Sequence, residues 1–330
     1  MIISKTPLRI SFAGGGTDLP SFYKENEYGA VLSTCVDSYI YVSIKEHTPL
    51  FDERIRLNYS ESELVDDVAQ IKNVIIRESL KFMEIDDRLY ISTISDAPAM
   101  TGLGSSSAFC VGLLNALYEY KGMVVSPGRL AKEAAHIEID ILKHPIGKQD
   151  HYAAAFGGLN YFMFHADGSV TVKPVIISEA VIRELSESMI SFWTRTTRSA
   201  QSVLSEQNEN AKKNSETLIA MRKQAADLVA LLESPGYSLE KFGRAVHAGW
   251  EMKQKLASKI SNNQIDSYYK TAVENGAYGG KISGAGGGGF LNIFAPVSAH
   301  PRIIESLRSF GIAHYKFHFS ERGTMVIRIK

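Results

Sequence analysis

The segment PAMTGLGSSSA, at residues 98–108, is the feature that most constrains the fold, because it joins a predicted strand to a predicted helix. Residues 89–95 have the composition of a strand, and apolar residues recur at helical spacing from Phe109 to Tyr118. The serines therefore fall on the first turn of a helix, whose N–H groups have no intrahelical partner and carry the positive end of the helix dipole. The pattern predicts a site that binds an anion, and phosphate is the expected ligand.

A glycine-rich turn before a helix also has a purely structural explanation. Gly-Leu-Gly makes a tight turn, and serine is preferred at a helix N-cap, the position expected for Ser105. Three consecutive serines exceed what capping needs, but this segment alone leaves the two interpretations equally supported. The Ser107 hydroxyl is also suited to a magnesium ion. The residues predicted to bind phosphate are Gly102, Leu103, Gly104, Ser105, Ser106 and Ser107.

The composition of the 330-residue chain is that of a globular protein, 45% hydrophobic and 22% charged. The 36 basic residues balance the 36 acidic ones, so no overall field attracts nucleic acid or an anionic membrane, and neither is expected as a partner. No signal-like start and no apolar run of roughly 18 residues is present, so the cytoplasm is the expected compartment. Cys35 and Cys110 form no metal-type cluster and are expected to be reduced.

Sequence patterns divide the chain into two parts, residues 1–177 and 178–330. In the first part we expect a β-rich opening broken into short strands, a helix across residues 63–83, and a helix that begins at Ser126-Pro127 and ends before Pro145. A hairpin turned at Asp167-Gly168 follows, and the boundary is placed after it.

The second part reads as helices and strands in a split β-α-β order. We expect long helices at 200–232 and 239–260, strands at 189–194, 281–283 and 290–295, then a helix and two terminal strands. This order predicts an α+β sandwich.

A second glycine-rich segment lies near the start, PLRISFAGGGTD at residues 7–18. It carries Arg9 on a strand, and Gly15 and Gly16 allow backbone to approach a ligand closely. Asp18, after Thr17, is suited to accept hydrogen bonds from vicinal hydroxyls. By itself, an aspartate in a loop is more often structural.

A third segment, KISGAGGGGF at residues 281–290, formally contains the GxGxxG dinucleotide pattern. A strand follows it rather than a helix, which argues against a Rossmann unit and against an oxidoreductase. Its loop still offers N–H groups to an anion or a sugar through Gly284, Ala285, Gly286 and Gly287.

Two carboxylates accompany these loops, Asp150 in GKQDHYAAAFGG and Glu138 twelve residues before it. Phosphoryl transfer needs a metal on the phosphates, cationic stabilisation, and a carboxylate that receives the hydroxyl proton. Glu138 and Ser107 are candidates for magnesium, Asp150 for the base and Arg9 for charge stabilisation. Without the other residues, Glu138 is more simply interpreted as a surface residue of a helix than as a magnesium ligand.

Together these segments resemble the GHMP kinase superfamily, named for galactokinase, homoserine kinase, mevalonate kinase and phosphomevalonate kinase, over nearly the whole chain. The resemblance implies an α+β fold, with an N-terminal ribosomal-protein-S5-like α/β domain, a C-terminal ferredoxin-like domain and the active site between them. It implies ATP and Mg²⁺ as cofactors. It also implies Asp150 as the catalytic aspartate, Arg9 as the arginine of the first motif, and Glu138 with Ser107 as the magnesium pair.

Thr17-Asp18 resembles the pair through which galactokinase binds sugar hydroxyls, but this chain has Gly15-Gly16 at the positions where galactokinase has Glu-His. This departure implies a different and roomier sugar pocket. A kinase-like binding protein without turnover is a further alternative, which the intact Asp150 and Glu138 disfavour.

Three segments are most similar to the branch of the superfamily that phosphorylates the anomeric C1 hydroxyl of D-glycero-D-manno-heptose 7-phosphate, on the route to nucleotide-activated heptose. They are AGGGTDLP, HPIGKQDHYAAAFGG and TRTTRSAQSVLSEQ. Fucokinases share much of these segments. A small-molecule sugar phosphate is therefore the expected partner, and a homodimer is left open. For the acceptor's own phosphate, Arg198 is the main candidate, with Lys148 and Arg195 as others.

Overall fold

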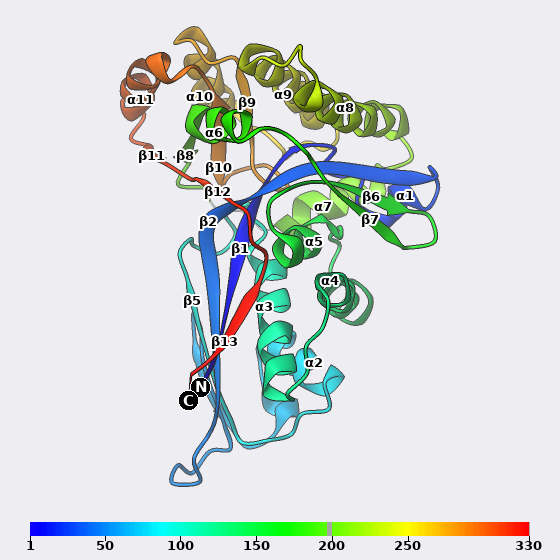
Figure 1. Ribbon diagram of the computed structural model, residues 1–330, viewed down its shortest axis with the longest axis vertical. Helices are drawn as coiled ribbons and strands as arrows, with labels where there is room; N and C mark the ends of the chain where they lie inside the picture. The colour runs from blue at the N-terminus through cyan, green and yellow to red at the C-terminus, as the bar shows by residue number, and fades with distance from the viewer. Residues whose placement is uncertain (197–199, 330) are drawn as a thin grey trace.

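Two mainly antiparallel sheets and the helices around them form the protein, of which the computed structural model describes residues 1–196 and 200–329 (Figure 1). The larger sheet has the order β13-β1-β2-β5-β3-β4, with β6 and β12 also paired to β2, and β7 paired to β6. Its strands are β1 (Ile2–Ala13), β2 (Tyr28–Glu46), β3 (Ile55–Asn58), β4 (Ser62–Val65), β5 (Leu89–Ser95), β6 (Leu159–His165), β7 (Val170–Pro174), β12 (Phe319–Ser320) and β13 (Met325–Arg328).

The β-rich opening is continuous rather than broken into short strands. β1 and β2 pair along their length, and the pairing register shifts between Pro7 and Leu8 and again between Ser11 and Ala13. Proline has no N–H to donate to a ladder, so a shift beside Pro7 is expected. The second shift comes just before the glycine loop.

The single helix predicted across residues 63–83 is wrong. The segment contains β4, a 3₁₀ turn η1 (Val68–Gln70) and α2 (Val74–Phe82). Asp67 and Asn73 cap the two helical pieces, because their side chains accept hydrogen bonds from Ala69 N and Ile76 N. These caps begin two new elements where apolar spacing alone suggested one.

The helix predicted at Ser126-Pro127 is present, and its N-cap is confirmed by the hydrogen bond from Arg129 N to the Ser126 side chain. After α4 (Pro127–Ala135), however, the backbone changes to a π-helix, η2 (His136–Ile141), which carries Glu138. Such wide turns are rare and occur often at functional sites.

The smaller sheet has the order β11-β8-β10-β9, with all neighbours antiparallel. In chain order this is 4-1-3-2, so the split β-α-β prediction and the ferredoxin-like arrangement are confirmed. The predicted helix at 200–232 is in fact two helices, α7 (Ala200–Glu209) and α8 (Ser215–Glu233). The strands are β8 (Met189–Trp193), β9 (Gly279–Ile282), β10 (Phe290–Phe294) and β11 (Ala313–Tyr315).

Helices cover both sheets. In Figure 1, α2 to α5 lie beside the larger sheet, and α6 and α9 to α11 gather around the smaller one, while α8 packs on β1, β2 and β6 of the larger sheet. The remaining helices are α1 (Pro20–Tyr23), α3 (Ser105–Tyr120), α5 (Gln149–Phe156), α6 (Glu179–Ser188), α7 (Ala200–Glu209), α8 (Ser215–Glu233), α9 (Leu239–Gln254), α10 (Asn263–Glu274), η3 (Val297–Ala299) and α11 (His300–Arg308).

The end of the chain returns to the first sheet. β13, which the sequence grouped with the second part, pairs with β1, and the Met1 amino group donates to Ile329 O at 2.8 Å. The two termini therefore lie side by side (Figure 1). The boundary predicted after residue 177 stays a prediction.

One hydrophobic core joins the two sheets. Phe12 of β1 meets Phe242 of α9 and Phe294 of β10 edge-on, with ring centroids 5.5 and 5.7 Å apart. Cys35 and Cys110 are buried and unpaired. No helix in the described part of the chain has the length and apolarity to cross a membrane.

Candidate active site

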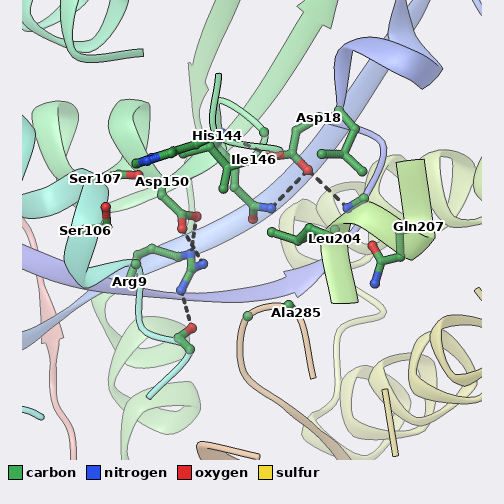
Figure 2. A pocket seen from close by; sticks show the side chains of 18 of the residues that line it. Arg9, Asp18, Ser106, Ser107, His144, Ile146, Asp150, Leu204, Gln207 and Ala285 are labelled. Carbon is green, nitrogen blue, oxygen red and sulfur yellow. Dashed lines mark hydrogen bonds and ion pairs between the residues drawn. The ribbon is translucent and has the colours of Figure 1, made fainter. Parts of the chain in front are cut away.

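A cavity of about 380 Å³ collects most of the residues that the sequence singled out (Figure 2). Its walls come from the glycine loop after β1, the loop and first turn of α3, the segment from η2 to α5, helices α7 and α9, and the loop after β9. The predicted site residues that line it are Arg9, Gly15, Gly16, Asp18, Gly102, Gly104, Ser105, Ser106, Ser107, Glu138, Asp150, Gly284 and Ala285.

The loop before α3 is not capped by a serine. The N-cap is Gly104, in the left-handed conformation with φ 78°, and no side chain caps the helix. The capping explanation for Ser105 is therefore wrong. All three serines belong to the first helical turn at the cavity wall, so their hydroxyls are not consumed by capping.

Two glycine loops touch through their backbones beneath this turn. A Cβ added to Gly102 would lie 2.6 Å from Ser283 O, and one added to Gly284 would lie 2.7 Å from Gly102 Cα. Both residues also have positive φ, at 79° and 63°. Only glycine permits this contact, which sets the loop after β9 against the predicted phosphate loop.

Arg9 and Asp150 form a two-pronged ion pair (Figure 2). Arg9 Nε donates to Asp150 Oδ1 and Nη2 to Oδ2, both at 2.7 Å, while Nη1 donates to Gly102 O at 2.6 Å. A Cβ on residue 104 would lie 3.1 Å from Asp150 Oδ2, so Gly104 gives the carboxylate room. The paired planar groups hold Asp150 in a fixed orientation at the cavity.

Glu138 is completely buried and held by three neighbours. Ser106 Oγ donates to Oε1, His151 Nε2 lies 2.8 Å from Oε2, and His144 Nδ1 lies 3.5 Å from Oε1. Burial alone raises the pKa of Glu138, but the hydrogen bonds from His144, His151 and Ser106 outweigh it and hold that pKa far below its usual range. The carboxylate is therefore ionised.

Ser106 is the serine that donates to Glu138, and the prediction that Ser107 and Glu138 hold a magnesium ion together stays a prediction. Ser107 is buried at the cavity wall, but the hydrogen bond to the Glu138 carboxylate comes from Ser106. Adjacent residues on a helix point about 100° apart, so the sequence alone did not resolve which hydroxyl reaches the carboxylate.

Asp18 is buried and accepts hydrogen bonds from the first residue of α5. Gly16 N donates to Oδ1 at 3.1 Å, and Gln149 donates from Nε2 to Oδ1 at 3.0 Å and from its backbone N to Oδ2 at 3.3 Å. Burial, and next the charge of Asp150, raise the pKa of Asp18.

Several predicted residues do not line the cavity. The Thr17 hydroxyl lies 2.7 Å from Gly14 O and 2.9 Å from Ala30 O, and so it shapes the glycine loop. Lys148 Nζ donates to Gly168 O at 2.8 Å, in a separate depression. Arg195 is exposed, and Arg198 lies outside the described residues. Away from the cavity wall, Leu103 is buried, Gly286 would meet Ile260 with an added Cβ, and Gly287 N donates to Ile260 O.

Sequence reasoning missed two polar residues that line the cavity from the second half, Gln207 on α7 and Lys253 on α9. Lys253 is 3% exposed, and its Nζ donates to Gly284 O. Burial, and next the charge of Arg9, lower the pKa of Lys253 to about 8, against the opposing effect of Asp18 and Asp150. Both sit on amphipathic helices with no motif to mark them.

An oriented carboxylate beside a glycine loop and a helix N-terminus, in a cavity lined by both halves of the chain, is an arrangement suited to phosphoryl transfer. The chain belongs to the GHMP kinase family: the model of the GHMP kinase N-terminal domain matches residues 57–158 and that of the C-terminal domain matches residues 225–313. It is thus a sugar kinase of that family, acting on a hydroxyl acceptor.

Known proteins of this family resemble the chain over most or all of its length. A D-glycero-alpha-D-manno-heptose 7-phosphate kinase of Campylobacter jejuni is 30% identical over 99% of each chain. A galactokinase of Pyrococcus furiosus is 24% identical over 87% of each. The crystal structure of a D-glycero-D-manno-heptose 1-phosphate kinase from Bacteroides thetaiotaomicron superposes with a TM-score of 0.80 at 26% identity, covering 100% of both chains.

Proposed function

We propose that this kinase transfers the γ-phosphoryl group of ATP to the anomeric C1 hydroxyl of D-glycero-D-manno-heptose 7-phosphate and forms the 1,7-bisphosphate. The observation that carries the proposal is the Arg9–Asp150 pair at a cavity that also holds Asp18 and the first turn of α3. The relative named as a heptose 7-phosphate kinase, similar over 99% of each chain, supports the choice of acceptor.

In this proposal Asp150 receives the proton of the attacking hydroxyl. Each Asp150 oxygen accepts one bond from Arg9 and keeps a further lone pair, so the ion pair orients the base without blocking it. The N–H groups at the start of α3 are suited to the phosphates of ATP, and Arg9 adds positive charge at the reacting group. Asp18 is suited to accept bonds from the sugar hydroxyls.

Glu138 and Ser106 fit a magnesium ion. They offer an ionised carboxylate and a hydroxyl beside the predicted phosphate site, and Mg²⁺ in such sites uses one or two carboxylates, the substrate phosphates and water. Within residues 1–196 and 200–329 no cluster of three His, Cys, Asp or Glu side chains offers a cage of its own. When bound, the ion neutralises charge on the phosphates.

The acceptor's own phosphate is assigned to Arg198 in this proposal. A second candidate function is phosphorylation of C1 on a sugar without a phosphate, as in fucokinases. The observation that favours it is that the other two basic candidates, Lys148 and Arg195, lie outside the cavity.

The test is a panel of free and phosphorylated sugars incubated with ATP and magnesium, with the new phosphate located by ³¹P NMR. The proposal predicts a new C1 phosphate on D-glycero-D-manno-heptose 7-phosphate and much slower turnover of L-fucose. Preference for an unphosphorylated sugar would favour the second candidate, and transfer to a position other than C1 would contradict both.

A further inference from the structure

We infer that Gln207 of α7 is a specificity-determining residue that donates a hydrogen bond to a hydroxyl of the acceptor sugar. This inference rests on the proposed function, because it requires a sugar in the cavity. It assigns one wall of the cavity to the hydroxyl-bearing face of the sugar rather than to its phosphate.

The first support is an unused donor. Gln207 is 5% exposed and lines the cavity, and among the described residues no group accepts a hydrogen bond from its buried Nε2 atom (Figure 2). A buried amide N–H without an acceptor costs free energy, and such groups in native proteins are few. A ligand hydroxyl in the cavity supplies the missing acceptor.

The second support is the contact between Gln207 and the glycine loop. Gly16 has φ +101°, and a Cβ added there would lie 3.5 Å from Gln207 Oε1 and 3.5 Å from Leu218 Cδ2. These are ordinary van der Waals distances, so Gln207 packs directly against the backbone of the glycine loop at residue 16. A side chain from the second half of the chain therefore lies against the glycine loop that carries Asp18 and lines the cavity beside it.

The third support is the polarity of the surrounding wall. Gln149 Oε1 is buried without a donor, while its Nε2 is bonded to Asp18. The wall thus combines a free donor on Gln207, a free acceptor on Gln149 and the Asp18 carboxylate. Vicinal hydroxyls both donate and accept, so they match this set, whereas a phosphate would meet the negative charge of Asp18.

The test compares Gln207→Leu and the isosteric Gln207→Glu with the wild-type enzyme, using D-glycero-D-manno-heptose 7-phosphate and L-fucose as acceptors. We expect the KM of the preferred acceptor to rise about fivefold to tenfold, as for the loss of a neutral hydrogen bond, while the KM for ATP and the thermal midpoint stay nearly unchanged. Gln224→Leu is the matched control, since Gln224 also has a buried unpaired amide oxygen but lies outside the cavity.

Deoxy analogues of the preferred acceptor identify the hydroxyl. One analogue should lose about the same factor with the wild type and show no further loss with Gln207→Leu, because the two changes remove the same bond. An active wild type whose acceptor KM is unchanged in both Gln207 variants, or raised equally in Gln224→Leu, overturns the inference alone. A wild type that phosphorylates no sugar overturns the proposed function, and this inference with it.

Discussion

At the scale of single residues, the contacts around Glu138 determine that its buried carboxylate is ionised. A fully buried carboxylate that stays ionised needs compensating hydrogen bonds, and Ser106, His151 and His144 supply them. Glu138 lines the cavity together with Ser106 and His144, beside the first turn of α3. The neighbouring hydroxyl of Ser107 lies at the same wall without contacting this carboxylate, and so provides an internal comparison.

Ser106→Ala should therefore raise the magnesium concentration needed for half-maximal activity several-fold, because it removes the hydroxyl next to Glu138. Ser107→Ala, on the adjacent position, should change it less. Magnesium titrations of initial rate at saturating ATP distinguish the two variants. A larger shift in Ser107→Ala would instead favour Ser107 as the serine that shares the magnesium ion with Glu138, as the sequence predicted.

Lys253 illustrates how a site residue can lower stability. Its ammonium group is buried, donates to Gly284 O, and within the described part of the chain has no carboxylate at ion-pair distance. Because its pKa falls to about 8 from an ordinary 10.5, the unfolded chain binds more protons than the folded one between these values. The free energy of unfolding therefore rises with pH across this window.

Lys253→Met should stabilise the protein at pH 7, by up to roughly 3 kcal/mol since one pKa unit corresponds to about 1.4 kcal/mol, and the gain should shrink towards pH 10.5. Activity should fall because a cation leaves the cavity. Urea unfolding at pH 7 and pH 10, with kcat measured in parallel, tests both effects. If the difference in free energy of unfolding between Lys253→Met and the wild type were the same at pH 7 and pH 10, the buried charge of Lys253 would not be destabilising.

At the scale of elements, the contact between two glycine loops sets the floor of the cavity. The loop after β9 presses on the loop before α3 through Gly284 and Gly102, and Gly289 N–H and C=O groups tie it to residues 194 and 196. Lys253 of α9 bonds the same loop at Gly284 O. Displacement of this loop would move both halves of the site at once.

Gly284→Ala should reduce activity more than tenfold and destabilise the fold by about 2–4 kcal/mol, since it combines positive-φ strain with a clash. Gly311→Ala is the matched control. Gly311 also has positive φ, at 74°, but nothing lies within 4 Å of an added Cβ, so we expect only about 1 kcal/mol and full activity. Equal losses in the two variants, by chemical denaturation and kcat, would rule out the loop contact as the cause.

The sequence predicted those elements whose chemistry is local. Strand, loop and helix around GLGSSS, and Arg9 and Asp150 in their motifs, follow from composition and spacing together with family resemblance. Gln207 and Lys253 do not, because a polar residue on an amphipathic helix has the same local pattern whether it faces solvent or a cavity. The prediction of one helix at 63–83 was wrong for a related reason. Asp67 and Asn73 are polar residues that fit the exposed face of a helix, but in the structure they cap the starts of two separate helical segments.

At the scale of the whole molecule, the cavity exists only because two halves meet. Asp150, Asp18 and Glu138 come from the first half, whereas Gln207 and Lys253 come from the second. The aromatic cluster of Phe12, Phe242 and Phe294, and the return of β13 to β1, tie the halves into one core. A donor on one side and carboxylates on the other are the arrangement that holds an acceptor hydroxyl next to a base.

The most direct test is the turnover of Asp150→Asn with ATP, magnesium and the sugar acceptor, measured beside ATP binding by calorimetry. The substitution keeps the size of the side chain and one acceptor oxygen for Arg9, so ATP binding should stay near wild type, while the thermal midpoint should fall because the other Arg9 donor then faces an amide NH2 group. Turnover should fall by about 10²-fold or more, as for removal of a positioned base. Retention of most of the activity would contradict the assignment of Asp150 as the base, which is the central claim of the proposed mechanism.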